Sequence, residues 1–363
     1  MTDKRPALCG LTRDELTAKL KEAGQPAYRA GQVLDWIYNK RVTSIDDMTN
    51  LPAPLRETLK ENFVVSHADV VTVQGAKDKT RKILYRLNDG RFVESVLIPA
   101  SPSLYGDRAD RRTICVSSQV GCAYGCKFCA SGLAGFTRNL DSGEIVSQLL
   151  ATEAHTGEKI NNIVFMGMGE PLANFKNLSK ALEIINSHWG LNIGARHITV
   201  STSGVAPVIK KLADIPIPVR LAISLHGATD EVRDRIMPVN SKWNIDALFE
   251  SLEYWRSKKK QKITFEFILI DGINDSMDQA VELAKRAKQL DAKVNLIPYN
   301  TVDGLTWKRP SNNRCQTFRK MLATHGVPAT LRLEKGHDID AACGQLRLKE
   351  EEKHGISDKP AAQ

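Results

Sequence analysis

Three closely spaced cysteines, Cys122, Cys126 and Cys129, have the clearest potential for chemistry in this chain. Three thiolates on one tight loop can hold a four-iron, four-sulfur cluster and leave its fourth iron open to a small chelating ligand. A structural zinc ion is the alternative, but zinc needs a fourth ligand, and neither His nor Cys follows within the next twenty residues. Cys115, seven residues upstream, could complete a zinc site. The spacing favours the iron–sulfur cluster and leaves zinc as the second possibility.

Two further cysteines and one carboxylate stand out beyond this loop. Cys343 lies in a segment near the end of the chain that is rich in glycine and aspartate and has little apolar periodicity. Such segments often line sites, whereas a buried free thiol is the plainer explanation for both Cys115 and Cys343. Glu94 lies inside a strongly apolar run. A carboxylate in that position is either paired with a cation or placed at a site.

Polar residues also follow several apolar runs. Gly169 would let the backbone approach a ligand closely, and Glu170 beside it could pair with an ammonium group. The hydroxyl groups of Ser201 and Ser224 could meet a ribose or a carboxylate, and His226 follows Ser224 closely. Helix capping and turn formation explain each serine equally well when it is taken singly. These residues would form a binding site only if the fold brought them close together.

Alternating strand-like and helix-like segments must position these side chains. Short apolar runs alternate with segments of helical periodicity from residue 113 onward. Strands are expected at 113–118, 162–166, 197–201, 219–224, 263–269, 293–297 and 328–333, and helices at 178–186, 205–212, 245–256, 277–290 and 315–325. Repeated βα units predict a parallel sheet with helices outside and sites at the carboxyl ends of the strands. The expected fold class is α/β, a partial (β/α)6 barrel.

The remaining segments predict smaller units. Residues 1–62 have helical periodicity and form an accessory domain, which either packs as an appendage or docks RNA. Residues 63–106 predict a β connector with a hairpin turn at residues 88–90. The basic stretch 77–82 in this connector is expected to be a solvated face that could meet phosphates. The barrel is expected at 107–347, including the Cys343 loop, and the charged segment 348–363 is expected to be a disordered tail.

Composition limits the classes of protein and partner. The chain has 363 residues, a net charge of +9 and seven cysteines. An odd number of clustered cysteines argues against a disulfide framework and for a reducing, cytoplasmic location. No run of 18 apolar residues occurs and the amino terminus lacks a hydrophobic signal region, so no membrane association is expected. The positive charge favours a polyanionic partner such as RNA.

Several motifs taken together resemble one family. They are Cys115-Val-Ser-Ser-Gln-Val-Gly-Cys122, the three-cysteine loop, Gly135-Phe-Thr-Arg-Asn-Leu140, Met168-Gly-Glu-Pro171 and Asp338-Ile-Asp-Ala-Ala-Cys-Gly-Gln-Leu346. The chain, from about residue 11 to about residue 347, resembles the RlmN/Cfr family of RNA adenine methyltransferases, which belong to the radical S-adenosylmethionine enzymes. RlmN-type members methylate carbon 2 of an adenine in 23S ribosomal RNA, and in many bacteria also in tRNA, whereas Cfr-type members methylate carbon 8. The resemblance favours the RlmN type.

The resemblance implies a mechanism with two molecules of S-adenosylmethionine. The first methylates Cys343, and the second is cleaved at the 4Fe-4S cluster held by the three-cysteine loop. The resulting 5′-deoxyadenosyl radical removes a hydrogen atom from the Cys343 methyl group, and the methylene radical adds to carbon 2. Cys115 then resolves the covalent protein–RNA adduct and leaves a Cys115–Cys343 disulfide. Glu94 corresponds to the acid–base or substrate-anchoring carboxylate.

The same resemblance implies binding residues and partners. The residues expected to bind S-adenosylmethionine are Gly169, Glu170, Ser201, Ser224, Leu225, His226 and Asn300. The expected partners are 23S rRNA, tRNA and an electron donor of the flavodoxin type, and a monomer is expected. The basic segments that could grip RNA are 77–82, 108–112 and 258–262.

The chain departs from the family in two places, and one alternative of another class remains. Glu334-Lys335 stands where the family usually has Ser or Thr followed by Arg. Lys335 keeps the positive charge, but its ammonium group cannot donate the two parallel hydrogen bonds of an arginine guanidinium. The loop 101–112 is longer than expected for the family. The alternative is a non-catalytic RNA-binding protein whose cysteine loop holds zinc.

Overall fold

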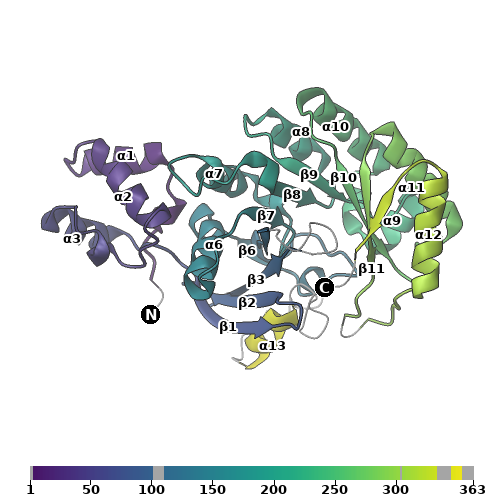
Figure 1. Ribbon diagram of the computed structural model, residues 1–363, viewed down its shortest axis with the longest axis horizontal. Helices are drawn as coiled ribbons and strands as arrows, with labels where there is room; N and C mark the ends of the chain where they lie inside the picture. The colour runs from purple at the N-terminus through teal and green to yellow at the C-terminus, as the bar shows by residue number, and fades with distance from the viewer. Residues whose placement is uncertain (1–2, 101–109, 303–304, 333–344, 354–363) are drawn as a thin grey trace.

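The computed structural model describes residues 3–100, 110–302, 305–332 and 345–353. Its first unit is a small helical domain made of α1 (Arg13–Glu22), α2 (Tyr28–Tyr38) and α3 (Ala53–Asn62) with the short turns η1 (Leu8–Gly10) and η2 (Ile45–Asp47). The first helix begins with a capping box, in which the Thr12 hydroxyl accepts from the Glu15 N–H and the Glu15 carboxylate accepts from the Thr12 N–H. This unit lies at one end of the molecule (Figure 1).

One sheet of ten strands forms the centre of the described structure, in the order β1-β2-β3-β4-β7-β8-β9-β10-β11-β12. Its first three strands are antiparallel: β1 (Asp69–Gly75), β2 (Arg81–Arg86) and β3 (Phe92–Pro99). The parallel strands that follow are β4 (Arg112–Cys115), β7 (Asn162–Phe165), β8 (Ile198–Thr202), β9 (Arg220–Ser224), β10 (Thr264–Leu269), β11 (Lys293–Pro298) and β12 (Ala329–Leu331). The antiparallel strands therefore extend the sheet of the barrel at its β4 edge.

Helices cover the outer face of the parallel strands (Figure 1). They are α6 (Ser142–Thr156), α7 (Phe175–Asn186), α8 (Ala206–Asp214), α10 (Ile245–Lys258), α11 (Met277–Gln289) and α12 (Asn312–Thr324). Phe265 and Phe267 of β10 pack on this layer through ring contacts with Phe249 and Phe318. Because side chains alternate along a strand, the residues between them face the inside of the barrel. The α/β fold class and the partial barrel of six βα units are confirmed, with β12 as a final parallel strand.

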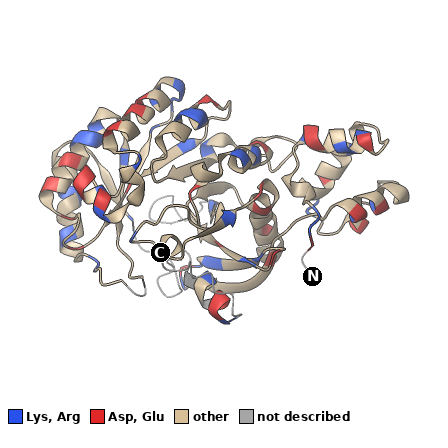
Figure 2. Cartoon of the chain, turned by 180° about the vertical axis from the view of Figure 1, so that it is seen from behind, with Lys and Arg blue, Asp and Glu red and all other residues tan. Residues whose placement is uncertain are grey.

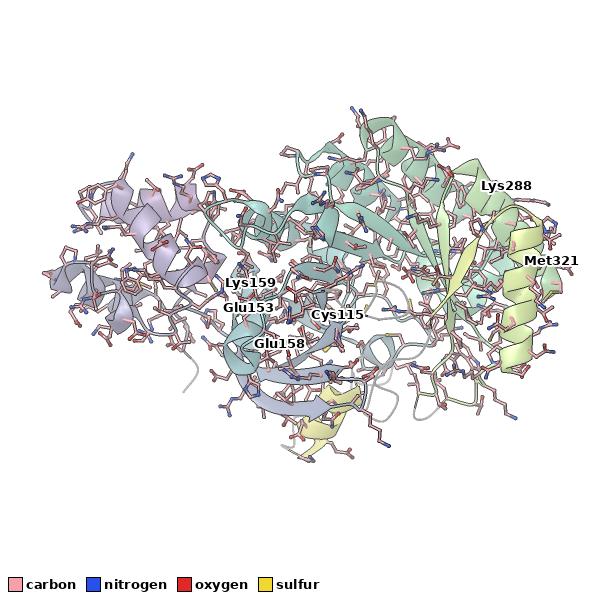
Figure 3. All side chains as sticks on the ribbon, in the orientation of Figure 1. Cys115, Glu153, Glu158, Lys159, Lys288 and Met321 are labelled. Atoms are coloured by element: carbon pink, nitrogen blue, oxygen red, sulfur yellow. The ribbon has the colours of Figure 1, made fainter. Side chains whose placement is uncertain are left out.

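The helix α6 joins the accessory domain to the barrel. Gly10 lies so close to Gly143 that a Cβ atom added at Gly10 would lie 2.5 Å from the Gly143 backbone. The Ser142 hydroxyl donates to the Gly10 carbonyl over 2.8 Å. Arg41 forms an ion pair with Glu153, with an N–O distance of 2.6 Å, and Figure 3 shows Glu153 on α6. The accessory domain is therefore packed directly on the first helix of the barrel.

Two expectations require correction. The β connector was expected from residue 63 onward, but Val64 forms only an isolated bridge to Ala7, and the first strand, β1, begins at Asp69. The expected disordered tail is wrong for residues 348–353, which form the end of α13 (Gln345–Lys353). Leu346 at its start packs on Leu84 and Phe92, and Arg347 pairs with Glu351 over 2.7 Å, so this segment has the apolar anchor and the ion pair that a helix needs. Residues 354–363 lie outside the described part of the chain.

Figure 2 shows Lys and Arg interspersed with Asp and Glu on the outer helices visible in that view. All three basic segments expected to bind RNA are partly neutralised. Arg81 and Arg112 both pair with Glu158, at 2.9 and 2.8 Å, and Lys262 pairs with Asp291 at 2.8 Å. The choice among these basic faces remains a prediction.

Candidate functional site

The three-cysteine loop begins directly after a short strand. The strands β5 (Gln119–Gly121) and β6 (Phe136–Asn139) pair antiparallel and enclose the loop and the short helix α5 (Ala130–Leu133). The Cys122 N–H donates to the Gly135 carbonyl over 2.8 Å, and the Cys129 N–H donates to the Cys126 carbonyl over 3.1 Å. The Lys127 N–H donates to the Ile236 carbonyl over 2.9 Å. Backbone hydrogen bonds therefore hold the loop at both ends and in the middle.

The chemistry of the three thiols fits a cationic cluster. Burial and, to a smaller extent, the neighbouring Cys129 thiol raise the pKa of Cys122 to about 12. Burial also raises the pKa of Cys126 and of Cys129. The thiols would therefore be protonated at neutral pH unless a bound positive charge stabilised the thiolates. A 4Fe-4S cluster can be held by three cysteine thiolates with its fourth iron open, whereas a structural zinc ion needs a fourth protein ligand, so the three cysteines of this loop suit the cluster better.

Glycines allow the loop to close tightly. A Cβ atom added at Gly132 would lie 2.9 Å from both the amide nitrogen and the carbonyl oxygen of Cys126. Gly121 has a φ of +77°, and its added Cβ would lie 2.0 Å from the Gly135 oxygen. By contrast, a Cβ at Gly125 would meet its nearest atom only at 3.9 Å. The position of the Cys126 backbone therefore depends on Gly132 and not on Gly125.

Gly132→Ala is expected to impair cluster assembly, because the added methyl group would displace the Cys126 backbone. After anaerobic reconstitution, the iron content of the variant should fall to less than half that of the unmodified protein. Gly125→Ala is the matched control in the same loop and should retain full iron and sulfide. Equal iron contents for the two variants would show that the close packing at Gly132 does not matter for cluster binding.

A buried glutamine connects the cysteine loop to the Gly169-Glu170 segment. The Gln119 side-chain oxygen accepts from the N–H of Ala123 over 3.1 Å and from the N–H of Glu170 over 2.9 Å. Gly169 has a φ of +94°, and a Cβ added there would lie 2.4 Å from the Gln119 Cβ. The contact requires glycine at position 169. Two segments far apart in sequence are thereby fixed side by side.

Glu170 is buried, and both of its carboxylate oxygens already accept hydrogen bonds. One carboxylate oxygen accepts from the Leu172 N–H over 3.0 Å, and the other accepts from the N–H and the hydroxyl group of Ser203 over 2.7 and 2.8 Å. Burial raises the pKa of Glu170, and these hydrogen bonds oppose the rise. The carboxylate oxygens can each accept more than one bond, so the predicted contact with an ammonium group remains a prediction.

The other expected binding residues lie along neighbouring strands of the sheet. Ser201 is in β8 and Ser224 ends β9, and both strands run parallel in the same sheet. Leu225 and His226 are both buried, and His226 has a φ of +55°. Asn300 follows β11 and is half-buried. The structure brings these residues to the carboxyl ends of their strands, and their binding roles remain predictions.

His226 is held as a neutral ring between a strand and the cysteine loop. Its Nδ1 accepts from the Ile268 N–H over 3.0 Å. Its ring meets the Phe128 ring edge-on, with 4.8 Å between centroids. Burial and the nearby Arg233 lower the pKa of His226 to about 3. This residue is therefore suited to packing and to hydrogen bonding rather than to proton transfer at neutral pH.

Arg233, in α9 (Asp230–Ile236), was not expected from the sequence. It is fully buried, and its guanidinium donates to the carbonyls of Leu225 over 2.6 Å and Ser203 over 3.0 Å, and to the Asn240 side chain over 2.9 Å. Burial lowers the pKa of Arg233 to about 10, so the guanidinium stays charged at neutral pH. It ties together the ends of β8 and β9, where the expected ligand contacts begin.

Cys115 lies at the end of β4, near the centre of the molecule, whereas Lys288 and Met321 lie on the outer helices α11 and α12 (Figure 3). Burial raises the pKa of Cys115 to about 11. The charges of Arg332 and Lys82 lower this pKa and that of Glu94 raises it. At neutral pH Cys115 is therefore a neutral thiol within reach of three charged side chains.

Glu94 is paired with a cation, which is one of the two expectations for it. Its carboxylate lies 2.9 Å from the Lys82 ammonium group, and the exposed fractions of the two side chains are 2% and 0%. The N–H of Arg347 in α13 donates to the same carboxylate. The expectation that the basic stretch 77–82 is a solvated face is therefore wrong for Lys82, because Lys82 shares an apolar face of β2 with Leu84.

Lys82→Met is expected to destabilise the protein, because it leaves the buried Glu94 carboxylate without its cation. The loss should be about 3 kcal/mol in the free energy of unfolding. The double variant Lys82→Met/Glu94→Gln should recover most of that loss, since no buried charge is left unpaired. Denaturant unfolding of the three proteins measures both values. Equal stability of the single and double variants would contradict this account of the pair.

Cys343 lies outside the described residues, as do Glu334 and Lys335 and most of the loop 101–112. The described chain resumes at Gln345, two residues after Cys343. From there α13 packs on β3 through Leu346, and Arg347 binds Glu94. The segment that carries Cys343 thus leads into a helix anchored on the carboxylate near Cys115.

Two family models match the chain. The model described as the radical SAM superfamily matches residues 116–284. The model described as the ribosomal RNA large subunit methyltransferase N-terminal domain matches residues 7–65. The first covers the cysteine loop and most of the barrel, and the second covers the helical accessory domain.

Curated relatives match almost the full length. A protein of Akkermansia muciniphila named probable dual-specificity RNA methyltransferase RlmN is 57% identical over 351 residues, which covers 96% of this chain and 98% of the relative. A protein of the same name from Staphylococcus aureus is 46% identical, with coverages of 95% and 94%. A crystal structure of a radical SAM methyltransferase from Sphaerobacter thermophilus is 42% identical, with a TM-score of 0.87 and coverages of 94% and 98%.

Proposed function

Because this chain belongs to the RlmN family of radical S-adenosylmethionine RNA methyltransferases, we propose that it methylates carbon 2 of an adenine in 23S ribosomal RNA and of an adenine in tRNA. The names of its relatives, which include the term dual-specificity, support both RNA classes. The observation that carries the proposal is the match over nearly the full length of the chain to relatives named RlmN. The placement of Cys115 at the end of β4, seven residues before Cys122, supports the radical chemistry.

The target atom explains why a radical mechanism is needed. Carbon 2 of adenine is electron-poor and is not a nucleophile. A direct polar transfer from a sulfonium methyl group would therefore be slow. A 4Fe-4S cluster held by Cys122, Cys126 and Cys129 would supply the electron that cleaves S-adenosylmethionine and starts the radical chemistry. The protein's own task is to bind the cosubstrate, to carry the methyl group and to release the product.

Cys343 would carry the methyl group, and Cys115 would release the methylated product. Cys343 would hold the methyl group as a thioether and, after loss of one hydrogen atom, bond to carbon 2 through the remaining methylene. The adduct radical would then give up one electron, for which the oxidised cluster would be the acceptor, and the hydrogen on carbon 2 would leave as a proton to a base. The Cys115 thiolate would then attack the Cys343 sulfur and form a disulfide. The bond between that sulfur and the methylene breaks, and its electron pair goes to the adenine product, where a proton completes the methyl group. An external dithiol would return the two electrons that the disulfide needs.

The surroundings of Cys115 suit this late role. Because burial raises its pKa to about 11, Cys115 would stay protonated until a base removes its proton or the nearby positive charges stabilise the thiolate. Glu94 would act as the acid–base or anchoring carboxylate, held in place by Lys82 and the Arg347 N–H. A resting thiol is less exposed to premature oxidation than a thiolate would be.

The partners follow from the same proposal. The helical domain, which matches the N-terminal model of the family, would contribute to RNA docking. A flavodoxin-type protein would supply electrons, and the enzyme would act as a monomer in the cytoplasm. Among the described helices, none is both long and apolar enough to cross a membrane. The proposed units are the helical domain 1–62, the connector 63–106 and the barrel with its Cys343 loop, 107–347.

Nucleoside analysis of cells that lack the gene tests the proposal. Ribosomal RNA and tRNA from deletion cells should each lose 2-methyladenosine, and the gene supplied on a plasmid should restore it. Loss from 23S RNA alone would remove tRNA from the proposal. Loss of 8-methyladenosine, with 2-methyladenosine unchanged, would contradict it in favour of the carbon-8 reaction.

A further inference from the structure

Glu266 is a buried carboxylate on the inner face of the barrel, and neither the expected site nor the mechanism uses it. It lies in the middle of β10 with an exposed fraction of 5%. Its neighbours Phe265 and Phe267 point outward onto the helices. Alternation along the strand therefore directs Glu266 into the barrel.

Only one oxygen of this carboxylate has a partner. Oε1 accepts from the Asn295 side-chain amide over 3.0 Å. Oε2 is buried and has no hydrogen-bond partner among the described residues. Burial raises the pKa of Glu266, although the charge of Arg332 and the bond from Asn295 oppose the rise. An orphaned, buried carboxylate oxygen costs free energy, and native proteins keep few of them without a reason such as a ligand.

Glu266 lies beside residues that are expected to bind S-adenosylmethionine. It is in register with Ser224 of β9 and with Asn295 of β11, so three polar side chains form a row across three strands. The Glu266 carbonyl accepts from the N–H groups of Leu225 over 3.0 Å and His226 over 3.4 Å. The residue that carries the orphaned oxygen is thus next to the Ser224-Leu225-His226 segment.

We propose that Glu266 Oε2 accepts a hydrogen bond from a ribose hydroxyl group of bound S-adenosylmethionine. A carboxylate is a common acceptor for ribose hydroxyl groups in nucleotide-binding α/β folds. The free cosubstrate offers two vicinal hydroxyl groups, whereas a nucleotide within an RNA chain offers only its 2′-hydroxyl. The inference deepens the proposed function and rests on it, since it requires that the barrel binds S-adenosylmethionine.

Binding of unreactive analogues tests this assignment without relying on turnover. The ligands are S-adenosylhomocysteine and its 2′-deoxy and 3′-deoxy forms, titrated calorimetrically into the anaerobically reconstituted protein. At least one deoxy analogue should bind about ten- to a hundredfold more weakly than the parent compound, the range expected for one hydrogen bond to a charged group. In Glu266→Gln this penalty should shrink to about threefold or less, because the charged acceptor is gone.

Controls keep the outcomes distinct. Glu250→Gln changes an exposed carboxylate on α10 and should preserve the full penalty, and Glu266→Asp serves as a second variant if Glu266→Gln does not fold. Equal binding of all three ligands by the unmodified protein overturns the assignment without any variant, as does an unchanged penalty in Glu266→Gln. Failure of the unmodified protein to bind S-adenosylhomocysteine at all would contradict the proposed function itself.

Discussion

Cys115→Ala is expected to trap the protein covalently on its RNA substrate. Without this thiol nothing attacks the Cys343 sulfur, so the methylene bridge between Cys343 and carbon 2 persists. Release of methylated RNA should fall by about a thousandfold or more, as is typical when a nucleophile is removed. Denaturing gels should show a species heavier than the free protein that RNase treatment reduces, and mass spectrometry should find a nucleotide attached at Cys343.

Cys315→Ala is the matched control for this experiment. Cys315 is also a buried free cysteine, but it lies on the outer helix α12 and packs in the main core. Its alanine variant should lose a little stability and should release product normally. Recovery of Cys115→Ala protein free of RNA, together with full product yield, would remove Cys115 from the release step.

Cys126→Ala should abolish cluster binding while leaving the fold intact. Two thiolates cannot hold a cluster that needs three protein ligands, so iron should fall from about four atoms per chain to less than one. The backbone bond from the Cys126 N–H to the Tyr124 carbonyl, 2.9 Å long, does not involve the side chain. The loop should therefore keep its course, and circular dichroism should be unchanged.

The functional consequence of Cys126→Ala is equally large. Formation of 5′-deoxyadenosine from S-adenosylmethionine should fall by at least about a thousandfold, because no electron reaches the cosubstrate. Cys315→Ala should again behave as the unmodified protein does. Retention of four irons by Cys126→Ala would mean that another residue is the third ligand.

The strands were predictable from sequence because their apolar runs are short and regularly spaced. The same criterion missed α6, which is buried on nearly all sides yet contains Ser142, Gly143, Ser147 and Gln148 among its buried residues. Their polar groups bond to the accessory domain and to the sheet; for example, Gln148 accepts from the Ser117 N–H over 2.9 Å. A helix that buries polar groups in this way has no apolar stripe to detect.

The site was predictable where spacing carries the chemistry, as in the cysteine loop. Residues that act through distant partners were missed. Gln119 was inconspicuous because its partners are Ala123 and a segment fifty-one residues away. Arg233 has no distinguishing feature in the sequence, although its guanidinium donates to the carbonyls of Leu225 and Ser203 after two neighbouring strands. Lys82 did carry a signal, since it lies two residues before the apolar Leu84 on the same strand face.

The comparisons decide between the functional alternatives that the sequence left open. A non-catalytic RNA-binding protein with a zinc site is wrong, because the relatives that match nearly the whole chain are RNA methyltransferases. The RlmN type is favoured over the Cfr type for the same reason. Composition and spacing could not make this choice, because both types would use the same cysteines.

The most direct test of the central claim uses S-adenosylmethionine with a trideuterated methyl group, the reconstituted protein and a 23S RNA fragment. If the methyl group passes through Cys343 and loses one hydrogen atom there, the released 2-methyladenosine should carry two deuterium atoms and one hydrogen from another source. Mass spectrometry of the digested RNA reads this number. A product that retains all three deuterium atoms, or one methylated at carbon 8, would contradict the account.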